Sequence, residues 1–279
     1  MNVLVLGGSG FVGRRVVQGL REQGYQVSTP SHRELDLLNV QEAAARRLLQ
    51  QQDVVVNTVG VMSRHATVLK TVHHHAPKQL AMWAKQAGVT HWVQLSALGA
   101  KAQHTVHFVG SKGRGDAAVC ESGLHVNIAR PSVIYGRSGA SCELFIKLAK
   151  LPVLMLPNGG RFDVQPVHVN EVAEGLINMV KQPLAHGSVV NMVGSRALTL
   201  AEYLSVIRET VHGEQALKVC SLPLGVLRPI LPLSNVLSNG MLSPSSIRLL
   251  EEGSCADGAD FAALLGRQAL AVEQFAQVV

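Results

Sequence analysis

VLVLGGSGFVG, residues Val3–Gly13, is the stretch that decides the fold of this chain. Its first four residues are apolar, and a short apolar run that ends in glycine is typical of a buried parallel β-strand. Apolar residues then recur at helical spacing through residues 11–23, and Gly24 supplies a stop for the helix. The stretch therefore predicts a strand, a glycine turn and a helix in immediate succession.

The glycines of this turn have the spacing of a phosphate-binding loop. Gly8, Gly10 and Gly13 satisfy G-x-G-x-x-G, and Gly7 precedes them. A diphosphate needs unpaired backbone N–H groups, the positive end of a helix dipole and a close approach of the chain, which side chains would prevent. A strand before the turn and an amphipathic helix after it are the context in which this motif binds a dinucleotide. We therefore expect a nicotinamide dinucleotide at this turn, with contacts from Gly7, Gly10, Phe11, Val12, Gly13 and Arg14.

The rest of the chain continues the alternation of strands and helices. Strands are predicted at residues 25–29, 53–58, 91–95, 125–129 and 189–193, and helices at 42–51, 73–86, 111–122 and 198–211, near 244 and near 270. Such alternation with short connections predicts a parallel sheet covered by helices on both faces. The fold class is therefore α/β, a Rossmann-type doubly wound parallel sheet with a smaller C-terminal substrate or partner lobe. We expect the dinucleotide-binding core in residues 1–194, with 137–160 contributing to the second lobe, and the C-terminal lobe in 195–279.

The composition is that of a folded protein with a large core. Of the 279 residues, 47% are hydrophobic and 16% charged, which excludes an intrinsically disordered chain. The net charge of +6 favours an anionic ligand or membrane surface. Lys and Arg form no dense run and only 4% of residues are aromatic, so a nucleic-acid partner is not expected.

No metal site or disulfide framework is expected. The four cysteines form no C-x-x-C pair. The run His73–His75 cannot direct three rings at one metal from a helix, because neighbouring side chains point in different directions. It predicts a solvated start of a helix instead.

The sequence predicts a cytoplasmic protein, with membrane association as an alternative. Neither a signal peptide nor a run of about 18 apolar residues is visible. The most apolar long stretch, residues 222–237, is interrupted by three prolines and Arg228. We expect it to contact a protein complex or a membrane surface, and not to cross a bilayer. The oligomeric state is open.

Residues after the second predicted strand favour NADP(H) over NAD(H). An acidic residue at the tip of that strand binds the ribose 2′-hydroxyl of NAD, whereas an arginine accommodates the 2′-phosphate of NADP. The segment from 28 to 33 has no acid, and Ser31 and Arg33 are expected to bind that phosphate. Asp36 follows closely and is expected to contact the adenine ring or its ribose.

Taken together, these stretches resemble extended and atypical short-chain dehydrogenase/reductases, the NAD-dependent epimerase/dehydratase-like proteins. The resemblance rests on GGSGFVG (7–13), DL (36–37), VVNTVG (55–60), SALGA (96–100), SK (111–112), RPS (130–132) and QPVHV (165–169), and it covers most of the chain. The most similar group contains the NADPH-binding accessory subunit of respiratory complex I. The resemblance implies that Val59, Gly60, Lys112 and Pro131 also contact the cofactor.

In active members of that family a Ser or Thr, a Tyr and a Lys form the catalytic site, with Tyr and Lys spaced as Y-x-x-x-K. The Tyr exchanges the substrate's hydroxyl proton, and the Lys lowers its pKa and holds the nicotinamide ribose. The resemblance places Ser96 and Lys112 in the Ser and Lys positions, but Phe108 stands in place of the Tyr. A phenyl ring has no ionisable hydrogen. His107, predicted to lie in the preceding loop, is a candidate substitute.

Three functions stay open from the sequence. The missing Tyr favours a protein that holds NADP(H) in a structural or assembly role and docks onto a larger complex. The retained Ser96 and Lys112 favour an oxidoreductase or epimerase with altered acid–base residues, acting on a quinone, a carbonyl or a sugar nucleotide. A regulatory protein that senses the NADP/NADPH ratio is the third.

Overall fold

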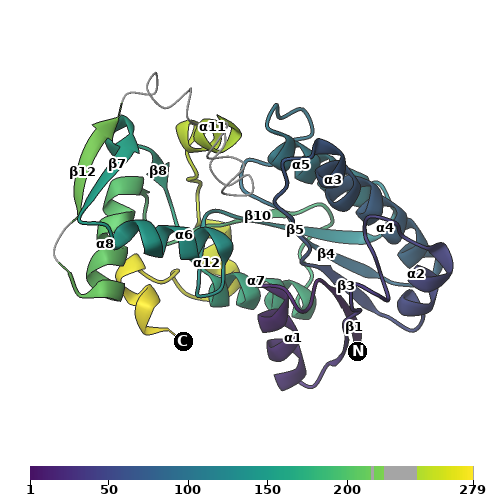
Figure 1. Ribbon diagram of the computed structural model, residues 1–279. Helices are drawn as coiled ribbons and strands as arrows, with labels where there is room; N and C mark the ends of the chain where they lie inside the picture. The colour runs from purple at the N-terminus through teal and green to yellow at the C-terminus, as the bar shows by residue number, and fades with distance from the viewer. Residues whose placement is uncertain (215–216, 223–243, 279) are drawn as a thin grey trace.

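A parallel sheet of six strands forms the centre of the computed structural model, which describes residues 1–214, 217–222 and 244–278 (Figure 1). The spatial order is β2-β1-β3-β4-β5-β10, and every neighbouring pair is parallel. The strands are β1 (Asn2–Leu6), β2 (Gln26–Ser28), β3 (Val54–Asn57), β4 (His91–Leu95), β5 (His125–Pro131) and β10 (Val189–Met192). The predicted Rossmann-type parallel sheet is confirmed.

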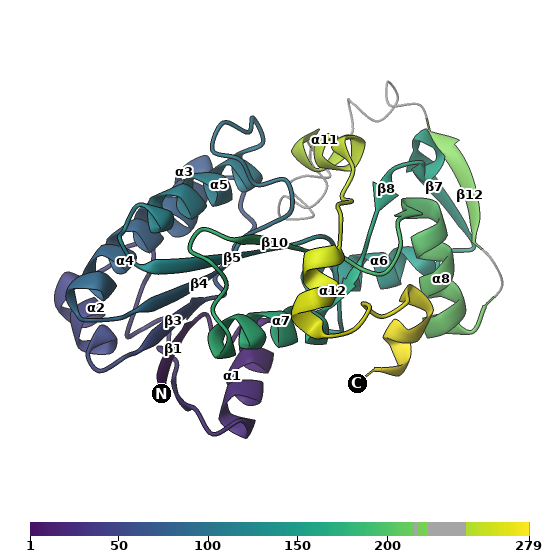
Figure 2. The same cartoon turned by 180° about the vertical axis from the view of Figure 1, so that it is seen from behind.

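Helices cover both faces of the sheet because successive side chains of a buried strand point to opposite sides. In β1, Val3 and Val5 belong to one hydrophobic cluster and Leu4 and Leu6 to another. The first cluster is covered by α1 (Gly13–Glu22), α7 (Val169–Lys181) and α12 (Ala259–Leu265), and the second by α2 (Glu42–Leu49), α4 (Ala76–Gln86) and α5 (His107–Cys120). Figure 2 shows the two helical layers from behind.

The strand order places a topological switch point beside the glycine turn, where open α/β sheets form the crevice that binds their ligand. β1 has β2 on one side and β3 on the other, so the chain moves from β1 to β2 in one direction and then crosses over to β3 in the other. In open α/β sheets, ligands bind outside the carboxyl ends of the strands at such a switch point. The glycine turn follows β1, and the segment from Thr58 to Gly60 follows β3.

A third hydrophobic cluster lies beyond the sheet and is built around Cys142, Tyr203 and Phe275. Its elements include α6 (Ala140–Ala149), β7 (Val153–Pro157), β8 (Asp163–Val164), β11 (Leu198–Thr199), α8 (Leu200–His212), β12 (Lys218–Leu222) and the 3₁₀ helices η2 (Asn158–Gly160) and η3 (Val272–Gln277). β7 pairs with β12, β8 with β11, and β6 (Ile134–Tyr135) with β9 (Val167–His168). Helix α11 (Pro244–Glu252) lies between this group and the sheet (Figure 1).

Several predicted boundaries are corrected. α5 begins at His107 and not at Ser111, so His107 lies in a helix and not in a loop. The helix predicted at 73–86 begins earlier, as α3 (Ala66–Lys70), and continues through a π-helical turn, η1 (Thr71–His75), into α4. Contrary to the predicted solvated helix start, His73 is buried, because this turn faces α5.

The long helix α7 was not predicted, whereas the capping box of Thr199 and Glu202 at the start of α8 is confirmed. The last predicted helix, near Leu270, is a short 3₁₀ helix. Of the apolar stretch 222–237, residues 223–237 lie outside the described part of the chain. Within the described part, none of the helices has the length and apolar character needed to cross a membrane.

Candidate functional site

The glycine turn is closed by backbone hydrogen bonds and packs directly against the start of α1. Gly7 adopts a φ of +75°, and its carbonyl accepts a hydrogen bond of 2.9 Å from the Gly10 N–H. A Cβ on Gly13 would lie 2.1 Å from the Gly7 oxygen and 2.6 Å from Thr58 Oγ1. Only glycine fits there, because both neighbours are held in place by β1 and β3.

Gly8 and Gly10 have different surroundings. A Cβ on Gly8 would lie 2.1 Å from Thr29 Oγ1, so Gly8 is needed for packing against the end of β2. A Cβ on Gly10 would meet only the Gly7 oxygen, at 3.0 Å. Gly10 is exposed and leaves room for a ligand to approach its backbone, with the amino end of α1 behind it.

Phe11 and Arg14 connect the turn to the loop between β6 and α6. Cβ atoms on Gly136 and Gly139 would lie 2.9 Å and 2.8 Å from Phe11 Cζ, so the ring packs against this loop. The Arg14 guanidinium donates to Ser138 Oγ in the same loop. Phe11 and Arg14, both predicted to contact the cofactor, therefore also connect the sheet to the elements around the third hydrophobic cluster.

The tip of β2 carries a carboxylate that the sequence reasoning missed. The Ser31 N–H and hydroxyl donate to Glu34 Oε2 at 2.8 Å and 2.7 Å, and these bonds lower the pKa of Glu34. Arg33 is exposed beside them. The Asp36 carboxylate accepts from the Leu38 N–H at 2.9 Å. The acid-free segment 28–33 ends one residue before Glu34.

Lys112 joins the carboxyl ends of two strands. Its Nζ donates to the Val59 carbonyl at 2.8 Å and to the Leu95 carbonyl at 2.9 Å, and the residue is 3% exposed. Burial lowers the pKa of Lys112 to about 8, with Asp116 opposing the shift. A Cβ on Gly60 would lie 3.6 Å from Nζ. The structure therefore brings Val59, Gly60 and Lys112 together beside the crevice.

Ser96 faces a buried carboxylate. Its hydroxyl donates to Asp116 Oδ2 at 2.7 Å, and Arg130 donates to the same oxygen at 3.0 Å. Asp116 is 3% exposed, and burial raises its pKa, with the bonds to Ser96 and Arg130 acting in the opposite direction. Pro131, at the end of β5, is buried next to Arg130, and its carbonyl accepts from the Leu98 N–H. The Ser96 hydroxyl is therefore held inside the protein by Asp116.

Phe108 packs on a neutral histidine. The ring centroids of Phe108 and His73 lie 5.5 Å apart with an edge-to-face angle of 86°. His73 Nε2 accepts a hydrogen bond from the Val61 N–H at 3.1 Å, and the Ser111 hydroxyl donates to the Phe108 carbonyl. Because Ser111 Oγ can then only accept from His73, we assign the tautomer in which His73 Nδ1–H donates to Ser111 Oγ at 2.9 Å. Burial, then Lys112, lowers the pKa of His73 to about 2.

His73 was missed by the sequence reasoning because its neighbours in the histidine run gave no signal of burial. The π-helical turn of η1 places it, and such turns are frequent at functional sites. The candidate substitute, His107, is instead exposed at the start of α5. His104 Nε2 bonds Glu252 of α11 at 2.8 Å.

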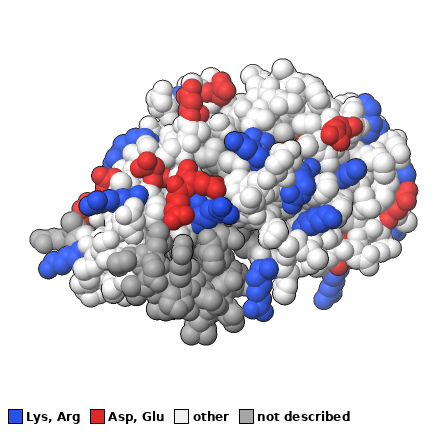
Figure 3. All heavy atoms as spheres, turned by 90° about the horizontal axis from the view of Figure 1, so that it is seen from above, with Lys and Arg blue, Asp and Glu red and all other residues white. Residues whose placement is uncertain are grey.

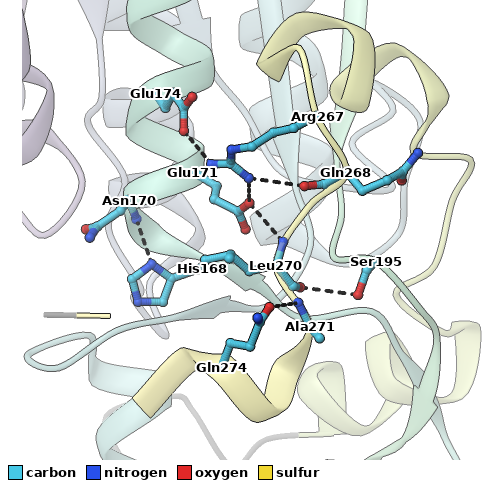
Figure 4. Close-up of polar contacts among 10 residues, drawn as sticks. All are labelled: His168, Asn170, Glu171, Glu174, Ser195, Arg267, Gln268, Leu270, Ala271 and Gln274. Atoms are coloured by element: carbon cyan, nitrogen blue, oxygen red, sulfur yellow. Dashed lines mark hydrogen bonds and ion pairs between the residues drawn. The ribbon is translucent and has the colours of Figure 1, made fainter. Parts of the chain in front are cut away.

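The start of α7 holds the C-terminal segment against the sheet (Figure 4). Glu171 is 1% exposed, and its Oε1 accepts from Arg267 at 2.6 Å and from the Leu270 N–H at 2.9 Å. His168 caps α7 by accepting from the Asn170 N–H, and burial, then Arg15, lowers its pKa to about 4. These contacts fix the tail on the same side of the sheet as the glycine turn's helix.

Comparison with known proteins confirms the family resemblance. Residues 3–107 match the NAD dependent epimerase/dehydratase family. The chain is similar to NADH dehydrogenase [ubiquinone] 1 alpha subcomplex subunit 9, mitochondrial, from Mus musculus, with 26% identity over 228 residues that span 75% of this chain and 60% of that protein. The same subunit from Dictyostelium discoideum is 25% identical over 73% of this chain and 62% of its own length. The match thus spans about 60% of these curated relatives.

Solved structures share the fold over nearly the whole chain. A nucleoside-diphosphate-sugar epimerase from Staphylococcus aureus has a TM-score of 0.78 at 17% identity, covering 99% of this chain and 100% of that one. A UDP-glucose 4-epimerase from Thermus thermophilus, in complex with NAD, has a TM-score of 0.72 at 19% identity, covering 99% and 98%. A dTDP-4-dehydrorhamnose reductase from Bacillus anthracis, in complex with NADP, has a TM-score of 0.74 at 14% identity, covering 99% and 97%. The chain has an NAD-dependent epimerase/dehydratase-like fold.

Proposed function

We propose that this protein holds NADP(H) as a structural part of its fold and docks onto a larger protein complex. One observation carries the proposal. The crevice keeps a glycine turn that only small residues can form, while the side chain four residues before Lys112 is Phe108, which has no proton to exchange. In this proposal residues 1–194 hold the dinucleotide, 137–160 join the second lobe, and 195–279 form the C-terminal lobe that contacts a partner.

The glycine turn and Lys112 support binding of a diphosphate and its ribose. Gly10 leaves room for close approach at the amino end of α1, and a helix of ten residues directs its positive end there. Lys112 has three N–H donors, of which Val59 and Leu95 take two. The third is available for a ribose hydroxyl. A bound dinucleotide would supply hydride chemistry, and this chain's residues would hold it and shield it from water.

The surroundings of Phe108 support a structural role over a catalytic one. His73 behind the ring is neutral, with its pKa lowered to about 2, and its two nitrogens are occupied. The Ser96 hydroxyl is engaged by Asp116. None of these three side chains offers a proton to a substrate in the crevice near neutral pH.

NADP(H) preference rests on Arg33, which is exposed beside Ser31 at the tip of β2. Glu34 in the same turn repels a 2′-phosphate, and the two donors of Ser31 bind only its Oε2, so the attraction of Arg33 has to exceed this repulsion. An unpaired guanidinium binds a dianionic phosphate in two-pronged geometry. A partner complex is favoured by the curated relatives, whose names describe them as subunits.

The test compares nucleotide binding with turnover. NADPH at 100 times its Kd should add about 2.7 kcal/mol of stability, or roughly 5–10 °C in the unfolding midpoint. Gly10→Ala should weaken binding at least tenfold, whereas Gly258→Ala, whose Cβ also meets its nearest atom at 3.0 Å, should not. Oxidation of NADPH with quinones, aldehydes and sugar nucleotides should stay at the blank rate. No thermal shift with NADPH would reject the proposal, and equal shifts with NADH would reject the preference.

A second candidate function is an oxidoreductase or epimerase, favoured by the lowered pKa of Lys112, about 8, which keeps a proton-transfer group in the site. Turnover of any compound of the panel by the unmodified protein, lost in Lys112→Met, would establish it. Activity that appears only in Phe108→Tyr would instead indicate a site that has lost its proton donor.

A further inference from the structure

One long segment of the chain contains no acidic residue. Between Asp53 and Asp116 there is no Asp or Glu, although the whole chain has 19 of them against 25 Lys and Arg. The segment comprises β3, α3, η1, α4, β4 and the first part of α5. Its helices belong to the outer layer on one face of the sheet. Because the segment has no carboxylates, the charged side chains that it contributes to this surface are all positive.

The positive side chains of this segment crowd together on one helix and its neighbour. Lys70, His74 and Lys78 follow one another along α3, η1 and α4, and Arg114 lies on the adjacent α5. Burial first, then the positive neighbours His75, Arg114, Lys78 and Lys70, lowers the pKa of His74. We call Lys70, His74, His75, Lys78, Met82 and Arg114 the basic face.

Acidic groups near the basic face are buried, paired or at its margins. Asp116 is 3% exposed, inside α5. Glu42 of α2 pairs with Arg46 at 2.7 Å, and Glu252 of α11 pairs with His104 at 2.8 Å. Glu121 lies beyond the end of α5. Seen from above in Figure 3, blue Lys and Arg atoms are spread over the right-hand half of the molecule, and red atoms there form a few separate spots.

We propose that the basic face lies against an anionic membrane surface. Each Lys or Arg near such a surface adds an attraction that falls off within a Debye length. Met82 lies on the same helix, four residues after Lys78, and is 48% exposed. An apolar side chain among lysines is the pattern by which a helix lying flat on lipid enters the headgroup region.

The residue types favour lipid over an acidic protein or a nucleic acid. Protein interfaces are enriched in Arg and aromatic residues and depleted in Lys. Nucleic-acid grooves add aromatic rings for stacking. The basic face presents Lys70 and Lys78 with a single arginine, and the one tryptophan of α4, Trp83, is buried.

Co-sedimentation with vesicles tests the proposal. The full chain is mixed with vesicles of phosphatidylcholine alone and with vesicles containing roughly 30% phosphatidylserine, at low and at physiological salt. We expect binding only to the anionic vesicles, weakened by salt. Lys70→Glu/Lys78→Glu should lower the partition coefficient at least tenfold. The matched control, Lys150→Glu/Lys181→Glu, changes net charge equally at exposed positions at the carboxyl ends of α6 and α7 and should lower the partition coefficient less than threefold.

Two results would overturn the proposal. One is the absence of binding to anionic vesicles, including the case where the chain binds polyglutamate or single-stranded DNA instead. The other is an equal loss in the two double variants, which would mean that net charge alone, or residues outside the basic face, governs binding. Met82→Ser should reduce binding severalfold at physiological salt, the condition of the two in which the electrostatic share of binding is smaller.

The result of the vesicle experiment does not depend on nucleotide binding. The NADPH-induced shift in unfolding midpoint is measured on all of these variants and should be unchanged, since the basic face lies outside the glycine turn. A retained shift also shows that each variant is folded. The membrane proposal can therefore fail while the nucleotide proposal stands, and the reverse.

Discussion

Acidification should unfold this protein partly through one residue, His73. Burial of the ring, then the charge of Lys112, lowers its pKa to about 2 in the folded protein, where both ring nitrogens are hydrogen-bonded in the neutral form. In the unfolded chain an unperturbed histidine titrates near 6.5. The unfolded state therefore binds more protons than the folded state between those two values, and stability falls as the pH drops below 6.5.

The size of the effect follows from linkage. At pH 4.5 the unfolded histidine is about two units below its pKa, and the folded one is still neutral, which costs about 3 kcal/mol relative to pH 7. His73→Gln removes this dependence but keeps a polar side chain. The variant should be less stable at pH 7, because the paired hydrogen bonds to Val61 and Ser111 change. Its stability should then decline with acid by about 3 kcal/mol less than that of the unmodified protein.

Urea unfolding followed by circular dichroism, at steps from pH 7 to pH 4.5, measures this difference. The other ionisable groups are the same in both proteins, so their contributions cancel in the comparison. His32→Gln is the matched control, because the His32 side chain is 81% exposed, and its curve should parallel that of the unmodified protein. Parallel curves for His73→Gln and the unmodified protein would refute the assignment of a buried, neutral His73.

Further predictions concern the turn, the tail and the buried lysine. Gly13→Ala places a Cβ 2.1 Å from the Gly7 oxygen and should cost about 1–3 kcal/mol in urea unfolding; a variant as stable as the parent would contradict the tight packing of α1 on the turn. Arg267→Ala leaves the buried carboxylate of Glu171 without its cation and should cost about 1–3 kcal/mol, because the Arg267 side chain is itself 42% exposed. Arg196→Ala, which breaks an exposed pair with Glu273, should cost less than about 1 kcal/mol. Lys112→Met should raise stability at pH 7 by on the order of 2–3 kcal/mol, since the lowered pKa of about 8 means that burial disfavours the charged form of Lys112. The same variant should bind NADPH more weakly in calorimetry. A less stable variant would show that the hydrogen bonds of Lys112 to the two strand ends outweigh the cost of its burial.

The sequence by itself determined the sheet and the turn. Apolar runs such as those of β1, β3 and β4 predict buried parallel strands, and the structure has each of them within a residue or two of its predicted ends. The capping box of Thr199 and Glu202 is equally local. These features depend on neighbours along the chain, where backbone geometry and side-chain periodicity act directly.

Only the tertiary structure decided what the polar groups of the site contact. Ser96 meets Asp116, which comes 20 residues later, and Lys112 meets the Val59 carbonyl 53 residues before it. His73 gave no sign of burial in a run of three histidines, and its pKa follows from the packing of η1 against α5. Periodicity says which face of an element is apolar, but hydrogen bonds between distant segments and the loss of water around an ionisable group exist only once the chain has folded.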